Sequence, residues 1–261
     1  MPVRTVRDVM GMPWTVEVRD ERVPPGLIEA LYADLEWVDR TFSTFRADSE
    51  IERLNRGELD LEGASPEVRE VLELSDAHSD MTGGCFSARP SGRLDPSGLV
   101  KGWAIARAAR LLLEAGCESY LVDGAGDVVV RGGRAAGALW RIGIRHPLER
   151  DKVARVIEAS DLAVATSGTY EKGPHLIDPR SGRPADGWLS FTVVGPDIVA
   201  ADVFATAGFV MGADGLEFVA SRPGYDAYAI DRDLVGSWTS GFPRRPEPAG
   251  LAAPYFKTVE Q

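Results

Sequence analysis

The stretch LDPSGLVKGWAIARAARLLLEAGCESYLVDGAGDVVV, residues 94–130, carries one long helical pattern followed by two short apolar runs. The apolar spacing predicts a helix over residues 98–113. Gly116 is suited to end it, because glycine adopts the left-handed C-terminal conformation without strain. Residues 120–122 and 128–130 are apolar runs typical of strands. A helix followed by two strands with only a short link between them does not fit a strict alternation of parallel strands and helices.

Similar signals flank this segment on its N-terminal side. Residues 14–18 alternate apolar and polar side chains and predict an opening strand. A helix is expected over 27–42, after the breaker Pro24-Pro25-Gly26, with Leu27, Leu31, Leu35, Val38 and Phe42 at helical spacing. Ser65 and Pro66 are typical of an N-cap and a first helical residue. Between these two helices, a polar loop over 43–50 leads into another short helix.

On the C-terminal side, strands outnumber helices. Strands are predicted at 140–144, 153–157, 162–165, 191–194 and 227–230, and helices at 199–211 and 215–220. The tail from about residue 242 is rich in Pro and Ala and is expected to run along the surface. We therefore predict an α+β fold of mixed, largely antiparallel sheets with packed helices. No linker divides the chain, so one domain is expected over 1–261.

Composition and charge exclude several classes of protein. The chain has 261 residues with 29 basic and 40 acidic side chains, a net charge of −11. Binding to nucleic acid or to an anionic membrane needs a basic face, so neither is expected. Cys85 and Cys117 are too few and too far apart for a disulfide framework or a zinc site. No signal peptide, lipoprotein anchor or membrane span is visible, which predicts a cytoplasmic protein.

The segment 94–103 is a candidate anion site. Its small residues precede a predicted helix N-terminus, where free N–H groups and the helix dipole favour a negative charge. Lys101 lies in the first turn and adds a point charge, while Asp95 is placed to accept hydrogen bonds from a ligand. The alternative is a turn that closes on a capped helix with an exposed lysine.

Asp202 and Thr206 form a second candidate. They lie four residues apart in a predicted helix, so a carboxylate and a hydroxyl project from one helical face. Two hard oxygen ligands suit Mg²⁺, which completes its coordination with water and phosphate oxygens. The alternative is that Asp202 caps the helix and Thr206 bonds back to a carbonyl.

Two further segments are ambiguous from spacing alone. Residues 123–127 contain two glycines between strands and predict either a hairpin turn or a close approach to a ligand. Residues 164–170 end a strand in hydroxyl side chains, and Lys172, His175 and Arg180 make a locally basic patch beyond it. No nucleophile elbow, Walker loop or dinucleotide fingerprint is present, so a covalent hydrolase and a nicotinamide dehydrogenase are not favoured.

Taken in order, these motifs resemble the ApbE family, the FAD:protein FMN transferases. The resemblance covers about residues 10–212. Its motifs are Met10-Gly11, Phe42-Ser43-Thr44-Phe45 through Asp48-Ser49-Glu50 to Leu54-Asn55, Leu94-Asp95 through Lys101-Gly102, Gly126-Asp127, Ala165-Thr166-Ser167-Gly168, Ile177-Asp178-Pro179, and Ala201-Asp202 through Thr206. Each motif is weak alone, and their common order carries the resemblance.

The resemblance implies an FAD site with Mg²⁺ at the pyrophosphate. The positions that match FAD contacts in the family are Met10, Phe45, Asp95, Lys101 and Ile177. The positions that match the metal ligands are the carbonyl oxygen of Gly98 and the side chains of Asp202 and Thr206. Phe45 stands where the family usually has Tyr.

The implied reaction is cleavage of the FAD pyrophosphate, with FMN passing to a Thr or Ser hydroxyl of an acceptor flavoprotein and AMP leaving. Phosphoryl transfer of this kind needs positioning and charge stabilisation rather than a protein nucleophile. Asp202 is a candidate to orient or deprotonate the acceptor hydroxyl, and His175 is the second candidate. Two alternatives are a Mg²⁺-dependent FAD pyrophosphatase that releases FMN and AMP, and a non-catalytic FAD-binding or carrier protein.

The chain also departs from the family pattern. Met12 stands where Thr is common, and Ser87 stands where Asp is common. The family's Trp-Gly-Phe run is absent before Asp95, so we expect a different wall of the flavin site, with Arg89 or Arg93 reaching the phosphates.

Overall fold

The computed structural model describes residues 2–135, 137–149, 151–168, 176–243 and 258–260. Its centre is one nine-stranded sheet in which every neighbouring pair of strands is antiparallel except the last. In spatial order the strands are β1 (Val3–Val9), β2 (Met12–Val18), β3 (Tyr120–Gly124), β4 (Asp127–Arg131), β7 (Leu162–Gly168), β10 (Ser190–Gly195), β11 (Asp226–Ile230), β12 (Gly236–Trp238) and β13 (Thr258–Glu260).

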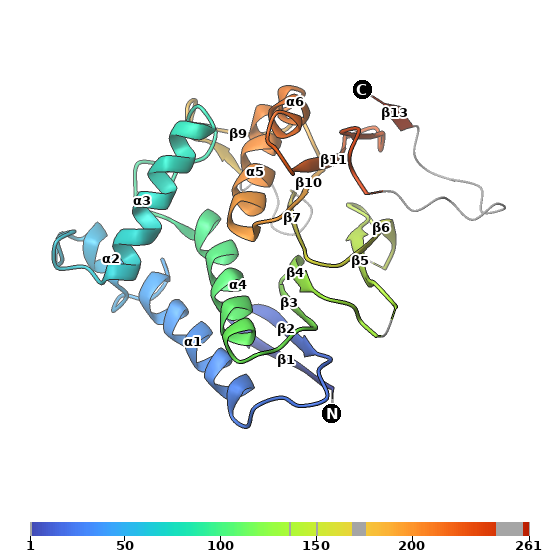
Figure 1. Ribbon diagram of the computed structural model, residues 1–261. Coiled ribbons are helices and arrows are strands. Elements are labelled where there is room, and N and C mark those ends of the chain that lie inside the picture. Colours follow the sequence, from blue (N-terminus) through green and yellow to red (C-terminus); the bar gives the residue numbers. More distant parts are fainter. Residues whose placement is uncertain (1, 136, 150, 169–175, 244–257, 261) are drawn as a thin grey trace.

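The described helices lie together along one side of the sheet (Figure 1). They are α1 (Leu27–Phe42), α2 (Glu50–Asn55), α3 (Pro66–Met81), α4 (Ser97–Glu114), α5 (Ile198–Met211) and α6 (Asp214–Ala220). Their apolar faces and one face of the sheet form the main core, to which β2 contributes the fully buried Trp14, Val16 and Val18. Burial of these side chains, rather than local helix propensity, holds the helices in place.

A smaller hydrophobic cluster fills the opposite face of the sheet. The hairpin of β5 (Trp140–Arg145) and β6 (Val153–Ala159) contributes Trp140, Ile142, Ile144 and Ile157 to it. In β4, Val128 and Val130 belong to this cluster, whereas Val129 packs against the main core. The alternation follows from the two-residue period of a strand. The middle of the sheet is therefore covered on both faces.

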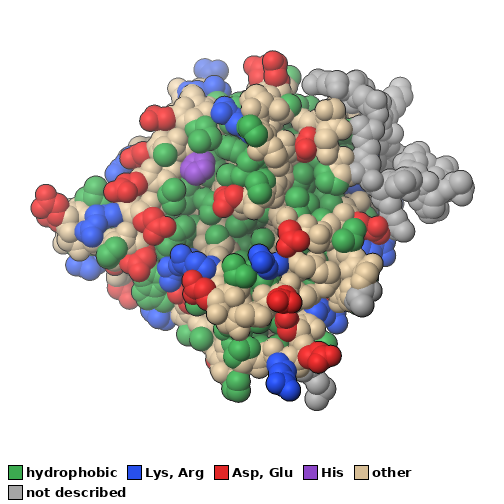
Figure 2. Space-filling view, viewed as in Figure 1, with side chains coloured by type: hydrophobic (Ala, Val, Ile, Leu, Met, Phe, Trp, Pro, Cys, Tyr) green, Lys and Arg blue, Asp and Glu red, His purple; other side chains and the backbone are tan. Residues whose placement is uncertain are grey.

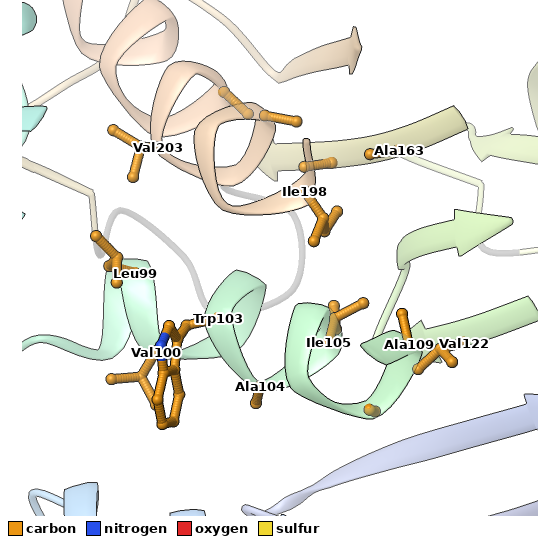
Figure 3. Close-up of a cluster of buried hydrophobic side chains, with 14 of the residues drawn as sticks. Leu99, Val100, Trp103, Ala104, Ile105, Ala109, Val122, Ala163, Ile198 and Val203 are labelled. Carbon is orange, nitrogen blue, oxygen red and sulfur yellow. The ribbon is translucent and has the colours of Figure 1, made fainter. Parts of the chain in front are cut away.

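The helices α4 and α5 pack closely against each other within the main core. Figure 3 shows Ile105 of α4 beneath Ile198 of α5, whereas Val100 and Trp103 extend from α4 on the side away from α5. Gly102, which has no side chain, allows the two helices to approach closely. Because both helices rest on the sheet, their mutual position is fixed by close packing.

The predicted fold class is confirmed: the chain combines helices with a large, mostly antiparallel sheet. The expected helix over 27–42 is α1, and Ser65 caps α3 by accepting a hydrogen bond from the Val68 N–H. Residues 123–127 form a hairpin turn between β3 and β4, with positive φ at Ala125 and Gly126.

Several short elements were not predicted. They are β1, β12, β13 and the two-residue strands β8 (Ile177–Asp178) and β9 (Arg183–Pro184), which pair with each other. The opening strand is in fact the second strand of a hairpin whose turn is Met10-Gly11. Most of the Pro- and Ala-rich tail, residues 244–257, lies outside the described residues.

The described surface is mixed in charge. On the face seen in Figure 2, Lys and Arg side chains lie among Asp and Glu side chains rather than apart from them. Within the described ranges, no helix is both long and apolar enough to cross a bilayer.

The packing of α5 on β10 predicts the effect of one added methyl group. A Cβ atom at Gly208 would lie 2.5 Å from Cε1 of Phe191, a fully buried ring. We expect Gly208→Ala to destabilise the protein by about 1–3 kcal/mol through overpacking, which corresponds to a fall in melting temperature of about 2–4 °C per kcal/mol. Thermal unfolding followed by circular dichroism measures this.

A second variant tests the cause of that loss. Phe191→Leu removes the ring that the new methyl group would meet, so the double variant should lose less stability than the sum of the two single variants. Additive losses, or an unchanged melting temperature for Gly208→Ala, would contradict the packing described here.

Candidate functional site

The candidate site is centred on the side chain of Lys101, which emerges from the second turn of α4. Its Nζ lies 2.5 Å from Oδ2 of Asp127 and 3.5 Å from Oδ1 of Asp202. Asp127 is the first residue of β4, and Asp202 lies in α5. Both carboxylates are almost completely buried, whereas a quarter of the Lys101 side chain is exposed. One ammonium group thus links three elements and can still be reached from solvent.

This arrangement shifts the protonation of two groups in the site. Burial raises the pKa of Asp202 to about 8, because Lys101 only partly offsets desolvation and Asp127 adds repulsion. Burial alone would lower the pKa of Lys101, but the two carboxylates raise it above its ordinary value. With both carboxylates ionised, the three side chains carry one net negative charge. A proton on Asp202 or an added cation would neutralise it.

Close contact between α4 and α5 positions Asp202. The backbone N–H of Gly102 donates to Oδ2 of Asp202 at 3.0 Å. A Cβ atom at Gly102 would lie 3.0 Å from the carbonyl oxygen of Ile198 and 3.1 Å from Cβ of Asp202, so the helices meet here with no side chain between them. In a regular helix the Gly102 N–H points at the carbonyl oxygen of Gly98. The oxygens of Gly98 and Asp202 are therefore within about 6 Å of each other.

Thr206 lies one turn after Asp202 on α5, and its hydroxyl is 3.1 Å from the hydroxyl of Ser167 on β7. The side chain that caps α5 is Asp197, which accepts from the Ala200 N–H at 2.8 Å. The alternative that Asp202 is the N-cap is therefore wrong. Asp202 and Thr206 instead extend the oxygen-rich region from α4 across to the sheet.

Asp127 and Ser167 were missed as site residues. Asp127 Oδ1 also accepts from the Thr166 N–H at 2.9 Å, so this carboxylate connects β4 to β7 as well as to Lys101. Gly126-Asp127 is part of the family resemblance, but the spacing of the segment predicts only a turn. The sequence signal that could have identified Asp127 is an acidic residue directly after the turn, at the start of an apolar strand.

The remaining predicted site residues lie in loops, a turn and a short strand outside the Lys101–Asp127–Asp202 group. Asp95 accepts from the Ser97 N–H at 3.1 Å just before α4, as expected for a turn that leads into a helix. Met10 sits in the β1–β2 turn with φ 57°, partly buried against the main core. Ile177 is half-buried in β8. Phe45 is 97% exposed in the loop before α2, with no burial against any of these residues.

His175 lies outside the described residues, as does Lys172 of the basic patch. We expected Arg93 to reach the phosphates, but its guanidinium is ion-paired with the nearly buried Glu52. Arg180 of the same patch is likewise engaged, with its Nε 2.9 Å from Oδ1 of Asp178. These arginines are therefore balanced by local carboxylates.

The oxygen donors fit a small divalent cation. Within the described ranges, no three His, Cys, Asp or Glu side chains come together as a metal-binding group. A carboxylate, a hydroxyl and a backbone carbonyl nevertheless suit Mg²⁺, which binds few protein ligands and takes the rest from phosphate and water. Two buried carboxylates around one ammonium group, which carry a surplus negative charge once Asp202 is ionised, favour such an ion.

Comparisons with known proteins agree in pointing to one family. The family model described as "ApbE family" matches residues 10–89 and 87–229. A Vibrio cholerae protein named FAD:protein FMN transferase is 35% identical over 131 residues, 46% of this chain and 39% of that protein. The aligned part of the chain thus spans less than half the length of that relative.

Solved structures share the fold. The ApbE protein from Thermotoga maritima gives a TM-score of 0.80 at 23% identity, covering 90% of this chain and 96% of the other. The flavinyl transferase ApbE of Pseudomonas stutzeri, in its apo form, gives 0.77 at 27% identity, covering 89% and 91%.

The raised pKa of Asp202 predicts a pH dependence of stability in the protein without ligands. A carboxyl whose pKa is about 8 when folded and near 4 when unfolded favours the folded state less and less as pH rises between these values. Asp202→Asn removes this dependence and keeps an acceptor for the Gly102 N–H. We therefore expect the variant to melt at a higher temperature than the parent at pH 8 and at a similar temperature near pH 4.

Melting curves at several pH values measure the effect. Asp8→Asn, a substitution of an exposed carboxylate on β1, is the matched control and should leave the pH profile unchanged. A lower melting temperature for Asp202→Asn at pH 8 would contradict the uncompensated burial of this carboxyl group.

Proposed function

Since the chain belongs to the ApbE family, we propose that it is a Mg²⁺-dependent FAD:protein FMN transferase. In the reaction, the acceptor hydroxyl forms a bond to the phosphorus of the FMN half of FAD. The pyrophosphate P–O bond breaks, AMP leaves with its own phosphate, and the hydroxyl proton passes to a base. The single observation that carries this proposal is the buried Lys101–Asp127–Asp202 group beside Thr206 and the start of α4.

We assign the metal ligands to the carbonyl oxygen of Gly98 and the side chains of Asp202 and Thr206. When bound there, Mg²⁺ would neutralise the pyrophosphate and stabilise charge on the leaving phosphate. The proximity of Gly98 and Asp202 through Gly102 supports this set. Because a proton and the cation compete for Asp202, binding of the cation should strengthen as pH rises through about 8.

FAD is the proposed substrate, held by Met10, Phe45, Asp95, Lys101 and Ile177. Lys101 would place a positive charge near the phosphates, and Asp127 would fix the direction of its side chain through the 2.5 Å ion pair. The exposed Phe45 is free of packing in its loop, so it would have to move onto the flavin when FAD binds.

The acceptor is proposed to be a flavoprotein with a Thr or Ser hydroxyl. A metal-bound carboxylate is a poor base, so Asp202 would mainly orient this hydroxyl. His175, two residues before Ile177, is the proposed proton acceptor. The cytosolic location of chain and acceptor stays a prediction.

Incubation of the protein with FAD, Mg²⁺ and a threonine-containing flavoprotein domain tests the proposed reaction. Transfer gives a fluorescent acceptor band on a denaturing gel together with AMP in solution. FMN and AMP without a labelled acceptor would show hydrolysis instead, and unchanged FAD would show carriage. Either of the last two results would overturn the transferase assignment.

Variants of the proposed metal ligands test the site. Asp202→Ala should lower transfer at least about 100-fold, since it removes the only charged ligand in the set. Thr206→Ala should weaken the response to Mg²⁺, and Thr206→Ser should restore it because it keeps the hydroxyl. The rate of AMP release as a function of Mg²⁺ concentration is the measurement.

Arg110→Gln, an exposed change on α4, should retain the parental rate. Turnover by Asp202→Ala at the parental rate would show that the metal assignment is wrong.

A further inference from the structure

A hollow of about 490 Å³ lies on the face of the sheet opposite to the helices, away from Lys101. Its lining contains four arginines and one glutamate, together with Leu121 and Trp140. The arginines are Arg4, Arg19, Arg134 and Arg141. Such a concentration of positive side chains is unexpected in a chain whose net charge is −11.

Strand register explains the floor of this hollow. Arg4 on β1 is directly opposite Glu17 on β2, and Glu17 is directly opposite Leu121 on β3. These three side chains therefore form one row across the sheet, on the same face. The neighbours of Glu17 in β2, Val16 and Val18, point into the main core instead. The hollow is thus built on the outer face of three paired strands.

Three arginine side chains lie around the carboxylate of Glu17. Glu17 is only 7% exposed and forms an ion pair with Arg19. Nε of Arg4 lies 3.4 Å from Oε2 of Glu17, and Nε of Arg134 lies 4.0 Å from Oε1. Arg19 contacts Oε1 of Glu17 and Arg4 faces Oε2, so these two arginines satisfy both oxygens. Arg134 adds a third positive charge that the single carboxylate does not balance.

The fourth arginine adds to this surplus. Arg141 on β5 is held by Glu158 of β6, with 3.5 Å between Nε and Oε1. Four arginines face Glu17 and Glu158, and Asp123 on β3 also lies near Arg4, so these groups leave one positive charge around the hollow. The side chains of Arg4, Arg134 and Arg141 are each more than half exposed, so their remaining N–H donors face solvent.

We propose that this arginine hollow binds a small molecule with at least two negative charges, a phosphate ester or a polycarboxylate, independently of the flavin site. Its volume lies in the range of about 300–1,000 Å³ that small-molecule sites occupy. Planar guanidinium groups present paired donors that match phosphate and carboxylate oxygens. Leu121 offers a small apolar surface beside the charged groups for a carbon skeleton.

Isothermal titration calorimetry with inorganic pyrophosphate and with citrate tests this site, at constant ionic strength in chloride buffer without Mg²⁺. We expect one equivalent of at least one of these anions to bind. Binding of pyrophosphate alone would assign the site to phosphate esters, and equal binding of citrate would assign it to polyanions in general. Binding of neither would overturn the proposal.

Two single variants locate the bound anion. Arg4→Gln and Arg141→Gln each remove an exposed guanidinium and leave the Arg19–Glu17 pair in place, so both should fold with the parental melting temperature. Each should weaken binding at least tenfold. Arg110→Gln makes the same change of charge on α4, on the helix side of the sheet, and should bind like the parent.

Competition separates this site from the flavin site. Saturating FAD should leave pyrophosphate binding unchanged if the anion occupies the arginine hollow. Displacement by FAD, parental affinity in both variants, or an equal loss in Arg110→Gln would each overturn the assignment.

Discussion

The ammonium group of Lys101, shared between two buried carboxylates, is the interaction on which the candidate site depends. It joins α4 to the start of β4 through Asp127 and to α5 through Asp202. Removal of one partner from a buried charged group is costly because the remaining charge loses its compensation. The three elements must therefore keep their relative positions as long as these side chains are present. When Asp202 is ionised, the same arrangement leaves one negative charge unbalanced, which a bound cation can neutralise in a cation-dependent reaction on a diphosphate.

Most of the larger elements could be predicted because their signals are local. The Ser65 cap, the first-turn Pro66 and the apolar spacing of α1 lie within a few residues of the structure they specify. The strand β1 was missed because its valines, Val3, Val6 and Val9, recur every three residues rather than every two.

The tertiary structure explains the irregular pattern in β1. Thr5 bonds the hydroxyl of Tyr32, and the Arg7 guanidinium lies over the ring of that tyrosine, 4.4 Å from its centroid. Polar side chains thus occupy inward positions where the alternation predicts apolar ones. No pattern within the sequence of β1 predicts that its polar side chains contact Tyr32 of α1.

The candidate site could be predicted only in part, for a similar reason. The four-residue spacing of Asp202 and Thr206 marks one helical face, and the helix start before Lys101 marks an anion site. That these two features adjoin follows from a contact between residues 100 positions apart, Gly102 and Asp202. Asp127 is likewise placed by tertiary contacts, with Lys101 and with the Thr166 N–H, so its own segment predicts a turn and no more. The family resemblance brought the segments together where spacing could not.

The bare backbone contact between α4 and α5 also limits how this chain tolerates insertions and deletions. A helix advances about 100° per residue, so one residue gained or lost between β10 and α5 would turn Asp202 and Thr206 away from their partners. Gly102 would then face a different side chain, for which the contact leaves no space. Variation in length among functional descendants of this sequence should therefore accumulate in exposed connections such as residues 60–63, while the link at 196–197 keeps its length.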